Sequence, residues 1–574
     1  MSRNSAARSK DKMKNKGIRI VNLVAIMGFL FVLAVAARLV ANEASSSGRA
    51  NAINPGHSSL RRSLGQVAVG GICDRDTDCA DVDAYCFLNV CSISDGNSYF
   101  YDQNAPDGGS GNSASSPLNG DLKDLLKSLK PGDTLTIVGE LTNPSYNSSY
   151  SFGSIDDDHL WHGENTLQIS KLNGEAGRPI TIKGQHKGHL LKGDGNNIIR
   201  VMQSSYLRFY KLEVQGEVEN IPFETAKALQ LVYKDPNGTV HYRVDPSLSD
   251  EEIAALSDLP KLSGVKRPSF TDTRGFYASD CHHIVVEKCH LHHTPGNGLR
   301  VSYSEYVDLL DNEINHCSLK SYSGTMGVTP TYIQDQISND PAGIYRLRVL
   351  RNNVHHNYNE IWSWNPTKTF IHTKIDEGKG ISCERCNTWQ NGGRALFAGN
   401  IVYWNGYSGL NCNDSSNLDF IGNTAYMNSY TASVWAVQQT GAKATGSRVG
   451  ITMNDGVSHR MYNNIAVCDT DVQGICLGAF RDAAVEADSN MQFGIGSLPL
   501  KLDDSQAFSY ANVATNQYVA DPQFKDPDSD NFRLKWNSPA LAVGNLTLSQ
   551  LAPLDYYSTP RDLVAPDLGA IERS

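Results

Sequence analysis

The sequence contains two nearly identical octapeptides, "AGNIVYWN" at 398–405 and "IGNTAYMN" at 421–428, which start 23 residues apart. They belong to a longer series in which an asparagine, or once a cysteine, stands in front of a short apolar run. The series consists of Cys289, Asn312, Asn352, Asn400, Asn423 and Asn463, with spacings of 23, 40, 48, 23 and 40 residues. We interpret 48 as about two units, and 40 as one unit with an insertion or two short units. Self-similarity with a period in the twenties is typical of a solenoid.

The apolar runs in these units are short, often β-branched or aromatic, and interrupted by glycine and asparagine. This pattern predicts short strands rather than helices, and the leucine ladder of leucine-rich repeats is missing. Asparagine suits a turn, because its side chain bonds to nearby backbone and it tolerates a positive φ. We therefore expect the repeated asparagines to stack as a structural ladder.

A second periodic element follows the anchors: "NGLRV" (297–301), "KGISC" (379–383), "SGLNC" (408–412) and "VGITM" (449–453). Side chains of a strand alternate between its two faces. The alternation sends Leu299/Val301, Ile381/Cys383, Leu410/Cys412 and Ile451/Met453 inward. It leaves one outward row on a parallel sheet, formed by Arg300, Ser382, Asn411 and Thr452. Cys383 and Cys412 are then core fillers or a disulfide between coils, and "CERC" (383–386) lacks the context of a redox pair.

The N-terminus combines charge and hydrophobicity in the order of a membrane anchor. Residues 1–19 hold seven basic residues and one acid, and the apolar run Ile20–Ala37 follows. Eighteen helical residues span about 27 Å, enough to cross a thin bilayer. We predict a cytosolic tail (1–19), a transmembrane signal anchor (20–41) and a flexible stalk (42–70), which makes a single-pass type II membrane protein. The alternative is a cleaved signal peptide, since "AVAA" permits cleavage, and then the chain is secreted.

Other features indicate an oxidising, lumenal or extracellular setting. Four N-x-S/T sequons follow the apolar run, at Asn147, Asn237, Asn413 and Asn545. A small module at 71–93 holds Cys73, Cys79, Cys86 and Cys91. Because this stretch has no histidine, we interpret it as two disulfides rather than a zinc site.

Composition narrows the class of protein further. The 574 residues carry a net charge of −10 with a pI near 5.9, which gives no reason to expect a nucleic-acid partner. Forty-nine glycines with modest charge suggest turn-rich β structure. We expect one large domain and a monomer.

Three blocks of the sequence resemble the pectate-lyase-like, right-handed parallel β-helix proteins. "LLKSLKPGDTLTIVGE" (125–140) is similar to the opening helix and first strand of that family. "GRPITIKG" (177–184) and "SSYLRFYKLEVQG" (204–216) are similar to its first coils, and "ADPQFKDPDSDNFRLKWNSPALAVG" (520–544) with "PDLGAIE" (566–572) to the ending of extracellular members. The resemblance implies an all-β fold over 94–574, a right-handed parallel β-helix with coils of about 23 residues, behind the transmembrane helix.

The family contains polysaccharide lyases, hydrolases, uronate epimerases and members without demonstrated activity, so the fold does not choose a reaction. The Asn-Thr-Asp turn and Asp-Asp pair of polygalacturonase-type hydrolases are absent, as is the Asp-Pro-His-type motif of alginate epimerases. We interpret "IDDDH" (155–159) as a solvated loop. The favoured expectation is a lyase that cleaves an acidic, uronate-containing polysaccharide by β-elimination.

β-Elimination needs a base for the proton α to a uronate carboxylate and a cation that neutralises this carboxylate. The best candidate region is "IHTKIDEGKGISCER" (371–385), where related sequences carry Asp-Gly-x-Gly-Ile and this chain has an additional Glu377. We assign base or carboxylate-binding roles to Lys379, Arg300 and Arg385. Substrate contacts are assigned to Asn411, Glu384 and Tyr407. Calcium is the candidate cofactor, with ligands Asp376, Asp414 and Asp455. A glycan on Asn413 would crowd this groove.

Two other groups of residues are candidates for a functional role. The pairs in "CHLHH" (289–293) and "NVHHN" (353–357) could bind a metal or shuttle protons, but turn stacking of His290, His292, His293, His355 and His356 is the simpler interpretation. Aromatic residues are candidates for sugar stacking, with some expected in the core: Tyr403, Trp404, Tyr407, Tyr426, Trp362 and Trp364.

The stretch 217–270 breaks the repeat and contains a helix near 245–262, with Ser249 as N-cap, predicted to wall one side of the groove. The alternative to a lyase is a non-catalytic cell-surface protein that binds glycan or serves as a scaffold. A uronate epimerase is a further alternative, since it shares the proton-abstraction step.

Overall fold

The computed structural model describes residues 84–573, except 89, 186–189, 322, 336, 338–339, 363–364, 372–374, 376, 430–448, 472–475, 482, 498–509, 514–516, 547–549 and 563. The chain forms two compact units, 1–63 and 64–574, and every described residue belongs to the second. The predicted tail, anchor and stalk lie outside the described residues, as do Cys73 and Cys79. In the part of the chain that is described, no helix has the length and apolarity needed to span a membrane.

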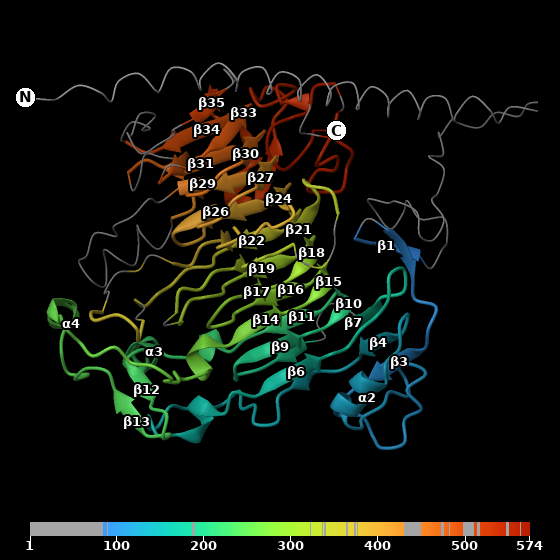
Figure 1. The fold of residues 1–574 in the computed structure, drawn as a ribbon, viewed down its shortest axis with the longest axis vertical. Coiled ribbons are helices and arrows are strands. Elements are labelled where there is room, and N and C mark those ends of the chain that lie inside the picture. The colour runs from blue at the N-terminus through green and yellow to red at the C-terminus, as the bar shows by residue number, and fades with distance from the viewer. Residues whose placement is uncertain are drawn as a thin grey trace, which may run out of the picture. The chain divides into compact units, whose positions relative to one another are not determined.

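Three long parallel sheets carry the described strands, and strands that are neighbours in one sheet come from successive turns of the chain (Figure 1). The nine-stranded sheet consists of β6 (Asn165–Ser170), β9 (Asn197–Met202), β14 (Arg274–Ser279), β17 (Leu299–Ser302), β20 (Val328–Thr331), β23 (Ile381–Glu384), β26 (Ser408–Asn413), β29 (Val449–Asn454) and β32 (Leu477–Phe480). One strand from each sheet makes one coil, so the fold is a parallel β-helix, as predicted.

The other two sheets complete each coil. The twelve-stranded sheet consists of β3 (Ser98–Tyr101), β4 (Thr134–Ile137), β7 (Ile180–Gly184), β10 (Ser205–Tyr210), β15 (His282–Glu287), β18 (Glu305–Leu310), β21 (Tyr345–Leu350), β24 (Arg394–Ala398), β27 (Leu418–Ile421), β30 (His459–Tyr462), β33 (Val485–Asp488) and β35 (Tyr510–Val513). The eleven-stranded sheet consists of β5 (Leu141–Thr142), β8 (Leu190–Lys192), β11 (Glu213–Gln215), β16 (His290–His292), β19 (Glu313–Asn315), β22 (Asn353–His355), β25 (Ile401–Tyr403), β28 (Thr424–Tyr426), β31 (Ile465–Asp469), β34 (Asn490–Ile495) and β36 (Gln517–Val519).

The remaining elements are short. Three antiparallel pairs lie outside the coils: β1 (Ala84–Phe87) with β2 (Val90–Ile93), β12 (Val232–Lys234) with β13 (Val240–Tyr242), and β37 (Phe524–Asp526) with β38 (Asn531–Leu534). The helices are α2 (Leu122–Ser128), α3 (Phe223–Leu229) and α4 (Asp250–Ala255), with 3-10 turns η2 (Asp158–Trp161), η3 (Val218–Asn220), η4 (Phe270–Asp272) and η5 (Pro527–Ser529). The predicted helix in 245–262 is thus confirmed as α4. Its N-cap is Ser249, which forms a capping box with Glu252.

Stacked asparagines hold successive coils together, as the repeat predicts. In the first ladder, Asn400 Oδ1 accepts the backbone N–H and the side-chain amide of Asn352, both at 3.0 Å. Asn400 Nδ2 in turn donates to Asn423 Oδ1 and to the Val349 carbonyl. This ladder comprises Asn312, Asn352, Asn400, Asn423, Asn464 and Asn490, and a second one comprises Asn357, Asn405 and Asn428. Buried amides that pair only with one another and with backbone satisfy groups that no water reaches.

Two details of the predicted repeat are wrong. The ladder uses Asn464 rather than Asn463, which takes the positive-φ turn position (58°) just before it. The spacing of 48 residues is one coil rather than two, since Asn353 pairs directly with Ile401 on the adjacent strand. Insertions between strands lengthen a coil without changing the stacking, so residue spacing alone miscounts coils.

The inside of the coils is a continuous apolar core. The inward residues of the predicted strips, Leu299 and Cys383 among them, are fully buried in it. Three glycines at the start of β20, β23 and β26 (Gly327, Gly380 and Gly409) lie against amides of the second asparagine ladder (Asn357, Asn405 and Asn428). A Cβ on Gly380 would lie 2.7 Å from Asn405 Nδ2, which is closer than real contacts allow. The glycine in "KGISC" is therefore required by the neighbouring ladder.

Cysteines in the coils behave in two ways. Cys383 and Cys412 are in register on β23 and β26, yet Cys383 is disulfide-bonded to Cys386 and Cys412 is a buried free thiol. The predicted role of Cys412 as a core filler is confirmed, whereas a disulfide between coils is not formed. In the N-terminal module, Cys86 and Cys91 are both disulfide-bonded.

Candidate functional site

The outward residues of the nine-stranded sheet form one continuous row. Arg300 is in register with Tyr277 on β14 and Thr329 on β20, and Asn411 is in register with Ser382 and Thr452. The predicted outward strip is thus confirmed as a row across adjacent strands. The row continues toward the N-terminus to Arg200 and Gln168.

Arg300 is a cation that forms no ion pair with the described residues, although the Asp272 carboxylate contributes to its electrostatic environment. Its guanidinium makes one hydrogen bond, from Nε to Ser302 Oγ at 3.3 Å, and no described carboxylate forms an ion pair with it. Burial, together with the nearby guanidinium of Arg274, lowers the pKa of Arg300, although an arginine stays protonated. A half-buried guanidinium that is not neutralised by its own protein is suited to bind an anion.

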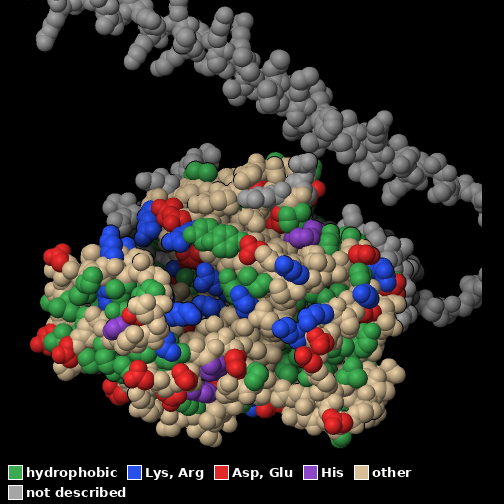
Figure 2. Space-filling model, turned by 60° about the horizontal axis from the view of Figure 1, so that its bottom comes forward, with side chains coloured by type: hydrophobic (Ala, Val, Ile, Leu, Met, Phe, Trp, Pro, Cys, Tyr) green, Lys and Arg blue, Asp and Glu red, His purple; other side chains and the backbone are tan. Residues whose placement is uncertain are grey.

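Two more arginines lie next to Arg300. The guanidinium of Arg200 on β9 donates to the amide oxygen of Gln168 at 3.4 Å and forms no ion pair with the described residues. Arg274 on β14 pairs with Asp272 at 3.2 Å, and its guanidinium lies 5.7 Å from the ring centre of Tyr277. Figure 2 shows Lys and Arg side chains gathered in a hollow of the visible face. Sequence reasoning missed Arg200 because β9 lacks the glycine that identified the other strips, whereas β14 carries the same pattern as "RGFYA" (274–278) and this signal was overlooked.

Lys379 is held between two carboxylates. Its Nζ lies 3.1 Å from Glu384 and 3.6 Å from Glu377, and the residue is 8% exposed. Burial alone would lower the pKa of the Lys379 ammonium, but Glu377 and Glu384 outweigh it and raise this pKa above the ordinary value. Lys379 is therefore a fixed cation in this arrangement rather than a free amine. The additional Glu377 supplies one of the two charges that hold it.

The predicted substrate contacts adjoin this group. Glu384 accepts from both Lys379 and Ser382, and the ring of Tyr407 lies 5.7 Å from Lys379 Nζ. Asn411, one strand further along, is buried and neither atom of its amide has a hydrogen-bond partner. The structure thus brings Lys379, Glu384, Tyr407 and Asn411 together.

The residues that directly follow the strands of the nine-stranded sheet form a second row. The residue after each strand takes a positive φ, from 48° to 60°, and these residues are Lys171, Gln203, Asp280, Tyr303, Tyr332, Arg385, Asp414, Asp455 and Arg481. Tyr303 and Tyr332 stack with ring centres 4.8 Å apart, and Arg385 donates to the Tyr332 hydroxyl at 2.8 Å. Tyr303 is 45% exposed, so this stacked pair offers a flat aromatic surface beside the arginines.

Of the predicted calcium ligands, Asp376 lies outside the described residues. Asp414 and Asp455 occupy the same turn position in adjacent coils. Asp455 pairs with Arg481 at 3.4 Å, and Asp414 adds to the electrostatic environment of Arg385. Calcium takes six to eight oxygens, and two carboxylates beside guanidinium groups do not by themselves make such a site. Calcium binding stays a prediction.

The histidine-rich turns stack, as the simpler interpretation expects. His293, His316 and His356 lie one above another with ring centres 4.9 and 5.3 Å apart and planes within 6°. Burial and neighbouring imidazoles lower the pKa of His316 to about 4. Neutral, stacked rings on three successive coils are structural.

This stack predicts a loss of stability in acid. A histidine titrates near pH 6.5 when unfolded, so the unfolded chain takes up the proton first, and the contribution of His316 is lost as pH falls from about 6.5 to about 4. We expect the urea midpoint of unfolding to fall across this range, and to fall less in His316→Asn. Asparagine tolerates the φ of 50° found there. Equal pH slopes in the two proteins would contradict the assignment.

Several aromatic candidates for sugar binding are wrong. Tyr403 and Tyr426 are buried in a separate apolar cluster with Phe524 and Phe532 of the C-terminal hairpin. This segment covers the outer face of the eleven-stranded sheet, so these rings cannot stack on a ligand. Trp362 is 2% exposed, and Trp364 lies outside the described residues.

The four sequons differ in their surroundings. Asn147 and Asn237 are exposed on loops, whereas the Asn545 amide donates to Asp488 Oδ2 at 2.7 Å and Asn413 accepts from Arg481. We predict that the protein, when it is produced in a secretory host, carries glycans on Asn147 and Asn237, whereas Asn545 carries little or no glycan. Peptide mass spectrometry after enzymatic deglycosylation measures each occupancy. High occupancy at Asn545 would contradict the prediction.

"IDDDH" is not simply a solvated loop. Asp157 caps η2, and the His159 ring lies beneath Tyr150, with ring centres 4.0 Å apart. Near it, His162 and the buried Asp194 complete a cluster of three ligand-type side chains. The string "HLWH" (159–162) was the available signal, and the distant Asp194 could be joined to it only by the fold.

Comparisons with known proteins agree with the resemblance noted in the sequence. The chain is similar to the solved structure of pectate lyase Pel9A, with 12% identity and a TM-score of 0.39 over 83% of this chain and 97% of that one. It is also similar to a rhamnogalacturonan lyase (12% identity, TM-score 0.33, 74% and 87% covered). A third match is a mannuronan C-5 epimerase A-module of Azotobacter vinelandii (12% identity, TM-score 0.32, 68% and 88% covered).

No protein-family model and no curated protein matches the chain. Structural likeness at such low identity and TM-score carries no argument about the reaction. The assignment of the fold rests on the strand pairing described above.

Proposed function

We propose that this protein is a carbohydrate-active enzyme that cleaves an acidic, uronate-containing polysaccharide by β-elimination. The observation that carries the proposal is Arg300: a half-buried guanidinium on the open face of the helix, with no described carboxylate in an ion pair with it. A uronate carboxylate would supply the missing charge. Neutralising that carboxylate makes the proton α to it easier to remove, which is the difficult step of the elimination.

The neighbouring side chains suit a polymer that runs along the sheet. Adjacent strands lie about 4.8 Å apart, so Arg200, Arg300 and Lys379 are spread over several sugar units. We assign Arg300 to the carboxylate of the reacting unit, and Arg385, Asn411, Glu384 and Tyr407 to units nearer the C-terminal coils. The stacked Tyr303 and Tyr332 provide an aromatic surface for a sugar ring.

Lys379 has a different role in this proposal from that of a base. Because Glu377 and Glu384 keep it protonated, it is suited to stabilise negative charge on a sugar unit further along the polymer. Tyr277, in register between Arg200 and Arg300, is the group we assign to accept the α proton on its phenolate oxygen and to return it to the leaving oxygen. Tyr277→Phe should then lower kcat with little change in KM.

The test is an elimination assay on the full-length chain. It is incubated with polymers of galacturonate, of glucuronate and of mannuronate–guluronate, with and without calcium, and the absorbance of the unsaturated uronate product is followed. A rise with one polymer supports a lyase, and its calcium dependence tests the predicted ligands Asp376, Asp414 and Asp455. No rise, with proton exchange at C5 of the uronate, would identify an epimerase instead.

A non-catalytic glycan-binding or scaffold protein is the second candidate. The exposed Tyr303–Tyr332 pair favours it, because stacked aromatics bind sugar rings without any chemistry. It predicts retention on a polysaccharide affinity gel without a product or proton exchange. If the chain shows no binding to any uronate polymer and forms no product from it, both proposals are overturned.

A further inference from the structure

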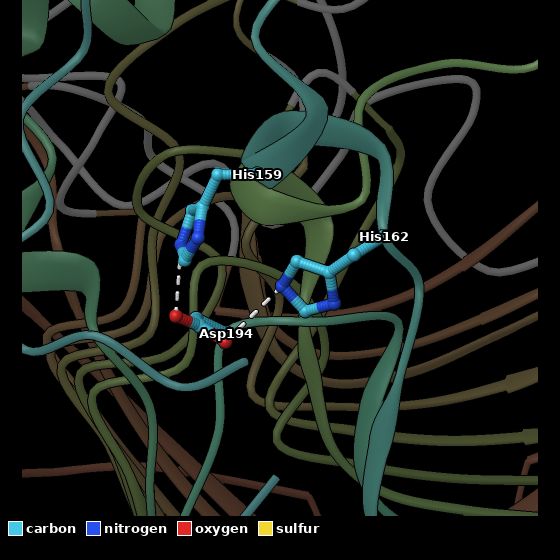
Figure 3. Close-up of side chains that lie close together, drawn as sticks. All are labelled: His159, His162 and Asp194. Atoms are coloured by element: carbon cyan, nitrogen blue, oxygen red, sulfur yellow. Dashed lines mark ion pairs between the residues drawn. The ribbon is translucent and has the colours of Figure 1, made fainter. Parts of the chain in front are cut away.

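Figure 3 shows two histidines that face one buried carboxylate at the N-terminal end of the coils. His159 and His162 belong to η2 and the residue after it, and Asp194 lies in the loop between β8 and β9. His159 Nε2 is 2.9 Å from Asp194 Oδ2, and His162 Nε2 is 3.3 Å from Asp194 Oδ1. These segments are more than 30 residues apart in the sequence, and no part of the proposed function uses them.

The contacts are poor hydrogen bonds despite their short distances. Both Nε2 atoms are shielded from solvent, and neither has a hydrogen-bond partner. The ring nitrogens therefore lie next to the carboxylate without pointing an N–H at it. A shared metal ion would account for this arrangement: with bonds of about 2.0–2.1 Å in tetrahedral geometry, nitrogen and oxygen ligands lie about 3.3–3.4 Å apart, which the His162 contact of 3.3 Å matches and the His159 contact of 2.9 Å approaches.

The surroundings are those of a built site. The Asp194 side chain is fully buried, and those of His159 and His162 are 13% and 11% exposed. Asn143 Nδ2 donates to Asp194 Oδ1 at 3.0 Å, and the Asn147 backbone N–H donates to Oδ2 at 3.1 Å. Such bonds orient a carboxylate toward a metal, as outer partners commonly do.

The proton of His162 sets one condition. Its Nδ1 accepts the backbone N–H of Glu164 at 3.1 Å, which places the ring proton on Nε2. A metal at Nε2 would displace that proton, and a proton placed on Nδ1 instead would cost the bond from the Glu164 N–H.

We propose that His159, His162 and Asp194 bind one divalent transition-metal ion, with zinc as the expected ion. Two imidazole nitrogens and one carboxylate suit zinc and its neighbours in the first transition row, whereas calcium prefers oxygen ligands only. Three protein ligands leave one position for water. The ion would fasten η2 to the loop that enters β9, the strand that carries Arg200.

A second cluster, Glu213 with His290 and His292, is a weaker candidate and serves as the control. Both of its histidines lie near the same oxygen, Glu213 Oε1, at 3.9 and 3.5 Å. His290 Nε2 also contacts the amide of Asn315, and His292 Nδ1 contacts His293 Nδ1. These contacts involve the ring nitrogens that do not face Glu213, and the cluster is the weaker candidate because its nitrogen–oxygen distances are longer than those at Asp194.

The test measures metal on the full-length chain after removal of bound ions with a chelator. Zinc or cobalt(II) is added back, excess is dialysed away, and bound metal is measured by mass spectrometry, with the visible spectrum of cobalt as a second readout. The variants are His159→Gln, His162→Gln and Asp194→Asn, and His292→Gln is the matched control. We expect about one ion per chain in the wild type and in His292→Gln, and at least a tenfold loss in the three variants.

Thermal unfolding separates loss of the site from loss of the fold. Zinc should raise the Tm of the wild type and of His292→Gln. It should not change the Tm of His159→Gln, a variant expected to stay folded because it keeps Asp194 and its bonds to Asn143 and Asn147. A wild type that retains no zinc, or a His159→Gln variant that retains it, overturns the proposal. Loss of zinc in His292→Gln alone would move the site to the second cluster and overturn it equally. None of these readouts depends on catalytic activity.

Discussion

Replacing Asn400 by leucine, which has nearly the same shape, is expected to destabilise the central coils by about 4 kcal/mol. Asn400 is fully buried, and its amide bonds to Asn352, to Asn423 and to the Val349 carbonyl. Leucine removes the acceptor of the Asn352 backbone N–H, one of the acceptors of the Asn352 amide and the donor to the Val349 carbonyl, while Asn423 Oδ1 still accepts the backbone N–H of residue 400. Each unsatisfied buried polar group costs about 1–3 kcal/mol, partly offset by the apolar side chain.

The midpoint of urea unfolding, followed by circular dichroism, measures this loss. Because a solenoid is stabilised coil by coil, hydrogen exchange should increase most in the coils of Asn352 and Asn423. Asn104→Leu, at an exposed turn, is the control and should stay within about 0.5 kcal/mol of the wild type. If Asn400→Leu behaved like the control, the ladder would not be a main source of cohesion between coils.

Replacing Arg300 by alanine is expected to lower kcat/KM on the uronate polymer that the enzyme cleaves by about 100- to 1,000-fold. The guanidinium is the group we assign to the carboxylate of the reacting unit, and its charge matters most when the α proton leaves. Arg300→Lys keeps the charge but loses the two-pronged geometry of the guanidinium, so an intermediate loss is expected. The same assay of unsaturated product measures both variants.

Two controls distinguish a role at the site from a change of net charge or of fold. Lys525→Ala removes one exposed positive charge from the C-terminal hairpin and should keep full activity. The Tm of Arg300→Ala should stay close to that of the wild type, because Arg300 has no ion pair to lose. Full activity in Arg300→Ala would show that Arg300 has no part in the mechanism. If no variant changed turnover, the binding-protein alternative would gain support.

Much of the architecture is predictable from the spacing of a few residue types. Asparagines before apolar runs indicate stacked coils, and the alternation in "NGLRV" and "SGLNC" places Arg300 and Asn411 on one outward row. Both predictions hold, because side-chain alternation and amide pairing depend only on local geometry. The length of a coil is less predictable, since an insertion such as the one before Lys379 lengthens the chain without adding a strand.

The candidate site is predictable only in part. Sequence places Lys379, Glu384 and Arg385 near one another, and the structure agrees. It does not reveal that Lys379 is paired with two carboxylates, because Glu377 belongs to a loop whose path is set by the coil beneath it. It also misses Arg200, which lies on a strand without the repeat pattern and joins the row only through strand pairing with Tyr277.

By itself, the sequence determined the parallel β-helix, the asparagine ladders, the outward row and the short capped helix of the insertion, because each follows from contacts within one residue pattern repeated along the chain. Only the tertiary structure decided which charges are neutralised, which aromatics the C-terminal hairpin covers and which distant side chains meet, as His159, His162 and Asp194 do. The physical reason is that ion pairing, burial and ligand geometry depend on distances between coils and loops. Residues far apart in the chain set these distances, and no local pattern records them.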